Sequence, residues 1–166
     1  KYPVESAAML ASIAEAIEPC RPGHAAREAL QAISRESQAS ITDLIAYGVE
    51  TTLEHIEPAA VFVPTHSGFT AKRLTRFRLP VWIVAVSSQE ATCQQLQFSY
   101  GVHPEHEPDH PDEWNVYVRE WLRAHEVAGS LVVLTEGPSS KRPEANNRME
   151  IIDLKAHSGA KGNPGA

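Results

Sequence analysis

The stretch "VFVPTHSGFTAKRL", Val61 to Leu74, decides how the chain is interpreted. A β-branched and aromatic run ends at Pro64. A cluster of hydroxyl residues with one glycine follows, and then a segment with basic residues and helical spacing. The apolar run does not alternate with polar residues, which is typical of a strand covered on both faces in a parallel sheet. The stretch therefore predicts a buried strand, a turn and a helix, in that order.

Further apolar runs extend this pattern in both directions. Residues 81–86, "VWIVAV", and 130–134, "SLVVL", are predicted as buried strands, and "MEIIDL" at 149–154 as the last strand. Partial alternation in the last strand fits an antiparallel edge. Strands alternating with helices predict an α/β fold, a three-layer sandwich around a mostly parallel sheet of about five strands, preceded by a helical lead-in.

Apolar residues at helical spacing predict the helices. Pro19 closes the first of them and Pro58 stops the third, while Ser87 or Ser88 is expected to cap the fifth. The three tryptophans lie on apolar stripes and are expected in the core. The predicted helices cover about residues 4–17, 25–34, 41–56, 68–77, 88–96 and 112–126.

The segment between the last two helices is rich in proline and histidine. Residues 97–102 are expected to hold a short strand, whereas 103–112, "HPEHEPDHPD", contain three prolines and are predicted as a loop. Metal sites use such residue types, but the prolines prevent a helix that would align them, and no second cluster completes a shell. A solvated, pH-sensitive loop is therefore favoured over a metal site. The residues in question are His103, His106 and His110, interleaved with Glu105, Glu107, Asp109 and Asp112.

Composition excludes several classes of protein. The 166 residues suffice for one domain that buries about 70% of its unfolded surface. A net charge of −6 argues against nucleic-acid binding, and no apolar run approaches the roughly 18–20 residues of a membrane span. Cys20 and Cys93 are isolated and are expected to be reduced thiols in a cytoplasmic protein. Because Lys1 falls within what looks like a helix, we expect a piece of a longer protein.

The first candidate site is the turn "PTHSGFT" after the opening strand. Ligands of open α/β sheets lie beyond the carboxyl ends of the strands, and free N–H groups at a helix start suit phosphate. Thr65, Ser67 and Thr70 add hydroxyl groups, and Gly68 is expected to let the backbone approach a ligand closely. The alternative is that Thr65 or Ser67 merely caps the helix. Spacing alone leaves both interpretations open and favours capping.

The second candidate is the polar stretch Gly137–Arg148, "GPSSKRPEANNR". It also follows a buried strand, so it is expected to rise from the same end of the sheet as the first turn. Lys141 and Arg142 would then reach an anion held there. The alternative, a solvated connection, is favoured from the residues alone. No GxSxG elbow or P-loop motif is present to indicate hydrolase or nucleoside-triphosphate chemistry.

Several segments together resemble pyruvate kinase. "KYPVESAAMLASIAEAIE" is similar to the last helix of that enzyme's catalytic barrel. "AAVFVPTHSGFTAKRLTRFRLPVWIVAVS" resembles the centre of its C-terminal domain, where a strand, a T-x-S-G-x-[ST]-A loop, a helix and a strand follow in order. "YGVHP", "GSLVVLTEG" and "NNRMEIIDL" resemble later strand regions. The resemblance implies a barrel remnant at 1–18, the C-terminal α/β domain at 19–155 and a flexible tail at 156–166.

The resemblance also implies a function. Pyruvate kinase transfers a phosphoryl group from phosphoenolpyruvate to ADP with magnesium and potassium, but its active site lies in the barrel and lid, so no catalytic residue is implied here. Its C-terminal domain serves regulation and assembly into dimers or tetramers, and contacts the catalytic barrel of the same polypeptide. The resemblance thus implies a phosphorylated allosteric effector, such as a sugar phosphate, at Thr65, His66, Ser67, Gly68, Phe69 and Thr70, with Lys141 and Arg142 closing over it.

The sequence departs from the family pattern at some of these positions. Phe69 stands where many members have arginine, and His66 replaces a residue that is often charged. No basic partner for a second phosphate is evident, so an effector with one phosphate is easier to support than a bisphosphate. The sequence also leaves open the interpretation that the site is degenerate and the domain purely structural. It likewise leaves open a stand-alone α/β domain that binds or acts on a phosphorylated metabolite without kinase activity.

Overall fold

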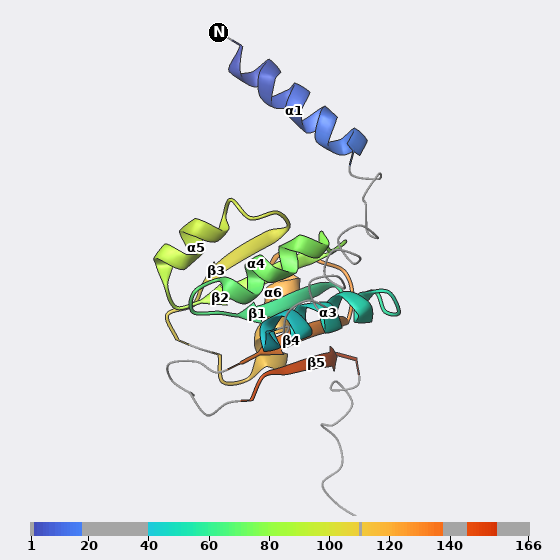
Figure 1. The fold of residues 1–166 in the computed structure, drawn as a ribbon, viewed down its shortest axis with the longest axis vertical. Coiled ribbons are helices and arrows are strands. Elements are labelled where there is room, and N and C mark those ends of the chain that lie inside the picture. The colour runs from blue at the N-terminus through green and yellow to red at the C-terminus, as the bar shows by residue number, and fades with distance from the viewer. Residues whose placement is uncertain (1, 18–39, 110, 138–145, 156–166) are drawn as a thin grey trace, which may run out of the picture. The chain divides into compact units, whose positions relative to one another are not determined.

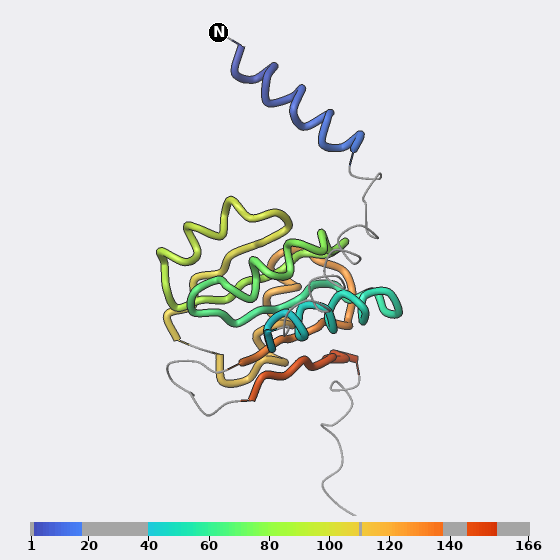
Figure 2. The backbone as a smooth tube through the Cα atoms, in the orientation of Figure 1, coloured from blue at the N-terminus to red at the C-terminus, as the bar shows by residue number. Residues whose placement is uncertain are grey.

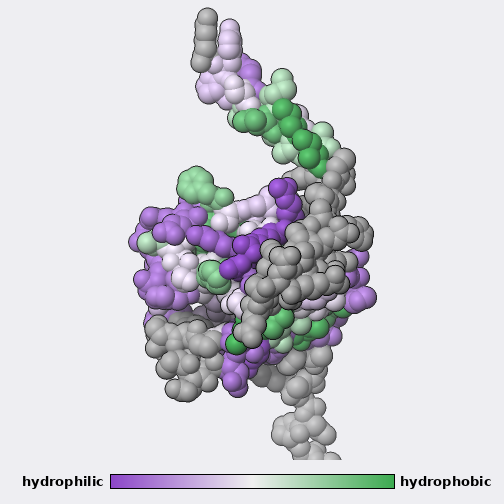
Figure 3. All heavy atoms as spheres, viewed as in Figure 1, coloured by the Kyte–Doolittle hydropathy of each residue, from purple (hydrophilic) through white to green (hydrophobic). Residues whose placement is uncertain are grey.

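The first compact unit of the chain contains one described helix. The computed structural model describes residues 2–17, 40–109, 111–137 and 146–155, and the chain divides into units at residues 1–37 and 38–166. Helix α1 spans Pro3–Ile17 and has no buried residue, and apolar side chains line it in Figure 3. The predicted helix at 4–17 is confirmed. The helix predicted at 25–34, Cys20 and the tail at 156–166 lie outside the described residues.

The second unit is built on a five-stranded sheet in the order β3-β2-β1-β4-β5 (Figure 1). Strand β1 pairs in parallel with β2 and β4, and β2 pairs in parallel with β3. Only β5 is antiparallel, against β4. The predicted fold class and the antiparallel edge are thereby confirmed. The strands are β1 Ala60–Pro64, β2 Trp82–Ser87, β3 Val102–His106, β4 Leu131–Glu136 and β5 Arg148–Asp153.

Helices cover both faces of this sheet, which makes three layers (Figures 1 and 2). Helices α3 (Ile41–Leu53), α4 (Phe69–Leu74) and α5 (Glu90–Leu96) lie on one face, and α6 (Trp114–Ala124) lies on the other. Because side chains alternate along a strand, β1 contributes to two cores. Its Phe62 packs edge-on against Trp121 of α6, whereas its Val61 and Val63 are also fully buried.

Local chemistry explains where two of these helices begin. Ser40 caps α3, because its side chain accepts a hydrogen bond of 3.1 Å from the Asp43 N–H. The helix ends at Leu53, three residues before its predicted end. The expectation that Ser87 or Ser88 caps α5 is wrong, since the cap is Gln89 without a side-chain bond. Ser87 is buried in β2 and its hydroxyl accepts the Gln89 N–H at 3.2 Å.

The predicted loop over residues 103–112 is wrong at its start. Residues Val102–His106 form strand β3, with Pro104 opposite Ala85 of β2. Proline is tolerated because β3 is an edge strand with one neighbour, so the missing N–H need not join a second ladder. The strand expected over 97–102 begins only at its last residue, after a turn in which Gly101 has a φ of 66°.

The tryptophans divide between core and surface. Trp114 and Trp121 of α6 are buried, as predicted. Trp82 is 52% exposed, so its expected core position is wrong. The reason is its place as the first residue of β2, where its ring lies 6.3 Å from that of His103 on the edge strand. Within the described residues, no helix is long and apolar enough to cross a bilayer.

Candidate functional site

The turn at residues 65–68 lies where the topology of the sheet changes direction. From β1 the chain continues outward through β2 and β3 on one side, and β4 and β5 then fill the other side. In open α/β sheets the ligand crevice lies at the carboxyl ends of the strands on either side of such a switch point. Here those strands are β1 and β4. Since they are parallel, the segments that follow Pro64 and Glu136 leave from the same end of the sheet.

Thr65 stabilises the turn itself. Its N–H donates to the Val86 carbonyl at 2.9 Å, which extends the pairing of β1 with β2 by one residue. Its hydroxyl oxygen accepts the Gly68 N–H at 2.9 Å. The N-cap of α4 is Gly68, which makes no side-chain cap bond, so Ser67 does not cap the helix. Thr65 therefore closes the turn ahead of α4, and its oxygen is already engaged as an acceptor.

Gly68 is required by packing inside the domain. Its φ is 74°, and a Cβ atom placed there would lie 3.1–3.2 Å from the side chain of Leu96, which is fully buried in α5. Gly68 is itself buried. The close approach expected between this glycine and a ligand is therefore found instead between the glycine and Leu96.

Donors for an anion remain on the outer side of the turn. The hydroxyl-bearing Ser67 is exposed and Thr70 is half-buried, while His66 and Phe69 are exposed. The N–H groups in the first turn of α4 have no intrahelical acceptor. A neighbouring helix also stabilises the turn, because the Thr92 hydroxyl of α5 donates a hydrogen bond to the His66 carbonyl at 2.8 Å. Exposed hydroxyls and helix-start N–H groups are the types of donor that bind phosphate groups in proteins.

The basic side chains near the turn differ in availability. Arg73 pairs with Asp43 of α3 at 3.1 Å and lies over the Phe69 ring at 4.7 Å, so it holds α4 against α3. Lys141 and Arg142 lie outside the described residues. At the end of β4, the Thr135 hydroxyl is buried and makes no hydrogen bond to any described residue.

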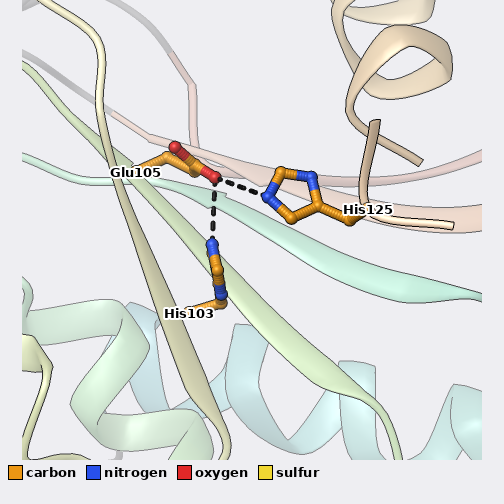
Figure 4. Close-up of side chains that lie close together, drawn as sticks. All are labelled: His103, Glu105 and His125. Carbon is orange, nitrogen blue, oxygen red and sulfur yellow. Dashed lines mark hydrogen bonds and ion pairs between the residues drawn. The ribbon is translucent and has the colours of Figure 1, made fainter. Parts of the chain in front are cut away.

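A second polar group lies at the β3 edge of the sheet, on the α6 face. His103 and Glu105 of β3 meet His125, which caps the end of α6 (Figure 4). Of the predicted histidine trio only His103 belongs to this group. His106 lies on the same strand but outside the group, and His110 lies outside the described residues. His125 follows directly after α6, in the segment predicted as a helix over 112–126, and nothing in the sequence pattern connects it to this strand.

Burial and nearby carboxylates raise the pKa of two groups near this edge, the buried Cys93 and the half-buried Tyr117. Burial raises the pKa of the Cys93 thiol above its ordinary value of 9.0, and the charges of Glu105 and Glu90 raise it further. Cys93 is free and buried, as predicted. Burial likewise raises the pKa of Tyr117, with a further contribution from Glu107. Both groups are therefore protonated at neutral pH, which gives no support to a thiolate nucleophile.

Comparison with known proteins shows the family. The profile described as "Pyruvate kinase, alpha/beta domain" matches residues 43–152, so the chain belongs to this family of domains. The chain is 31% identical over 155 residues to a pyruvate kinase of Thermococcus litoralis, covering 93% of this chain and 33% of that protein. It is 32% identical to a pyruvate kinase of Geobacillus stearothermophilus, covering 91% and 26%.

A solved structure shares the fold. Cryptosporidium parvum pyruvate kinase in complex with ADP superposes with a TM-score of 0.74 at 15% identity, covering 93% of this chain and 31% of that one. The resemblance found in the sequence is thereby confirmed at the level of family and fold. The chain spans about a third or less of the length of these relatives.

Proposed function

We propose that this chain is the regulatory and assembly domain of a pyruvate kinase and binds a phosphorylated effector at Thr65–Thr70. Membership of the family and the coverage of only part of each relative support a domain that works beside a catalytic barrel. The parent polypeptide would transfer a phosphoryl group from phosphoenolpyruvate to ADP with Mg²⁺ and K⁺, in the cytoplasm. The chain itself contributes no catalytic residue.

The observation that carries the effector site is the position of the turn. It leaves β1 at the switch point between β1 and β4 and starts α4, with the Ser67 hydroxyl exposed. Backbone amides of the first helical turn and the hydroxyls of Ser67 and Thr70 would surround one phosphate group. Arg73 is paired with Asp43, so we assign the positive charge that closes over the effector to Lys141 and Arg142.

Calorimetry with a panel of sugar phosphates tests this site. A hydrogen bond to a charged group contributes about 1.5–3 kcal/mol, so Ser67→Ala is expected to weaken binding by roughly ten-fold or more. Thr70→Glu is expected to abolish binding, because it brings a carboxylate to the amides that hold the phosphate. Ser88→Ala, an exposed serine outside the turn, serves as the control and should bind like the unmodified chain.

Two results would contradict effector binding at the turn and leave it with a structural role only. One is the absence of binding by any phosphorylated ligand at millimolar concentration. The other is binding that Ser67→Ala and Thr70→Glu leave unchanged. Gly68 is unsuitable as a test position, because any side chain there also meets Leu96.

A coupled assay with phosphoenolpyruvate, ADP, Mg²⁺ and K⁺ tests whether catalysis belongs to the barrel and not to this chain. Phosphoryl transfer depends on positioning and charge stabilisation, which the proposal assigns to the barrel. We expect no turnover above background from this chain. Activity that copurifies with it would contradict a purely regulatory role.

A further inference from the structure

Three side chains with metal-binding atoms converge between the edge strand and α6. His103 and Glu105 are two residues apart on β3 and therefore project from the same face. His125, at the end of α6, completes the group. The ligand atoms that the three residues offer all lie within 4.8 Å of one another. Figure 4 shows both imidazole rings turning a nitrogen toward one carboxylate oxygen of Glu105.

The distances fit the ligand shell of a small ion. Zn²⁺ binds histidine nitrogen and carboxylate oxygen at about 2.0–2.2 Å, so ligand atoms in a tetrahedral shell lie about 3.3 Å apart. Here Glu105 Oε1 lies 3.0 Å from His103 Nε2 and 3.5 Å from His125 Nε2. These separations bracket the tetrahedral value. The third separation, between the two histidine ligand atoms, is at most 4.8 Å, so closure around an ion also depends on the two rings.

Trp121 already supplies the contacts that orient metal ligands. The His125 Nδ1 lies 2.9 Å from the Trp121 carbonyl oxygen, and since a carbonyl only accepts, Nδ1 carries the proton. His125 Nε2 then faces Glu105 with a lone pair in the neutral ring, which suits a cation between them. The indole Nε1–H of Trp121 donates to Glu105 Oε1 at 2.7 Å. Metal-bound histidines and carboxylates are held by outer hydrogen bonds of this kind.

The three side chains are also exposed enough for an ion to reach them from solvent. The side chains of His103, Glu105 and His125 are 39%, 24% and 36% exposed. A water molecule can therefore reach a fourth coordination position. Two imidazoles with one carboxylate suit Zn²⁺ and neighbouring transition metals better than Mg²⁺ or Ca²⁺, which prefer oxygen ligands.

From this geometry we propose that His103, Glu105 and His125 form a binding site for a divalent transition-metal ion of the Zn²⁺ type. The ion takes the place of the direct contact between His103 Nε2 and Glu105 Oε1. It links the edge strand β3 to the end of α6 and so stabilises the α6 side of the domain. This site is separate from the effector turn, and its test does not depend on the regulatory role.

Titration of the metal-free full chain with ZnCl₂ and CoCl₂ tests the proposal. We expect one strong site at micromolar metal, the intense visible absorption of four-coordinate Co²⁺, and quenching of indole fluorescence by Co²⁺, because Trp121 stacks on His125 at 4.1 Å. The melting temperature should rise with Zn²⁺ and return when a chelator is added. Binding should weaken as pH falls, since the ligands must be deprotonated.

Three variants assign the site to these residues. His125→Gln, His103→Gln and Glu105→Gln should each weaken binding by at least about ten-fold and remove the Zn²⁺-dependent rise in melting temperature. His106→Gln is the matched control, because it removes an exposed imidazole from the same strand outside the group. Glu105→Gln keeps an acceptor for Trp121, so metal-free melting temperatures reveal any fold defect separately.

The proposal fails on either of two outcomes. In the first, the unmodified chain shows no saturable Zn²⁺ or Co²⁺ binding at micromolar metal. In the second, a site is present but His106→Gln weakens it as much as His103→Gln and His125→Gln do, which would assign it to other histidines.

Discussion

Gly68 and Gly101 share a backbone conformation but differ in what surrounds them. Their φ angles are 74° and 66°, both in the left-handed region that side chains disfavour. A Cβ at Gly68 would lie 3.1 Å from Leu96, whereas nothing lies within 4 Å of one at Gly101. The pair therefore separates the cost of the backbone angle from the cost of crowding.

We expect Gly101→Ala to destabilise the domain by about 1–2 kcal/mol, the cost of a left-handed alanine. Gly68→Ala should cost about 1–3 kcal/mol more, because the added methyl also displaces Leu96 in a filled core. Urea unfolding of both variants measures the difference. Equal losses would mean that α5 adjusts freely and that Leu96 does not constrain the turn.

At the level of elements, the cap of α3 shows how a helix start is stabilised by one side chain. Ser40 Oγ accepts the Asp43 N–H at 3.1 Å and donates to the Asp43 carboxylate at 2.6 Å. The same carboxylate pairs with Arg73 of α4. The cap thus lies in a chain of contacts that joins two helices on one face of the sheet.

Ser40→Ala should lower the free energy of unfolding by about 1 kcal/mol, the usual loss for an N-cap. Ser88→Ala should change it little, because Ser88 is exposed and α5 is capped by Gln89. Denaturant midpoints of the two variants provide the comparison. If Ser88→Ala proved the costlier change, the cap position of α5 would have to be revised.

At the level of the whole molecule, β5 forms an edge of the sheet, with no further strand beside it among the described residues. Among the described strands β5 pairs with β4 alone, and an edge strand of this kind is a common place for pairing with another chain. Apolar side chains are exposed on β5 and on the neighbouring α3, and Figure 3 shows hydrophobic spheres over this region. They are Ile41, Leu44 and Tyr47 of α3 and Ile151 of β5. We propose that the assembly into dimers or tetramers uses this surface, through a two-fold contact.

We expect light scattering at micromolar concentration to show a dimer or tetramer. Ile151→Lys, which places a charge on a side chain that is 50% exposed beside the open edge, should shift the chain toward the monomer. Val116→Lys on the outer side of α6, 54% exposed, is the matched control and should leave association unchanged. A monomeric unmodified chain would contradict assembly through β5.

Much of this architecture is encoded locally. Strands β1, β2 and β4 each contain an unbroken apolar run of four or five residues, which predicts a strand covered on both faces. The turn after β1 is likewise recognisable from Thr65, Ser67 and Gly68. Hydroxyl side chains hydrogen-bond to nearby backbone groups and glycine adopts a positive φ, so both residue types favour turns. The sequence alone therefore determined the fold class and the candidate anion turn, and the resemblance of its motifs, taken in order, determined the family.

Only the tertiary structure decided the strand at the sheet edge, the role of Gly68 and the histidine–glutamate group, because these features depend on which elements become neighbours. Pro104 made β3 resemble a loop, and only its place at the sheet edge permits a strand. Gly68 is explained by Leu96, a residue 28 positions later that packing brings to it. His125 joins His103 and Glu105 only because α6 ends over the edge strand. Spacing along the chain cannot reveal contacts that arise when a helix crosses a sheet, so this cluster became visible only in the folded molecule.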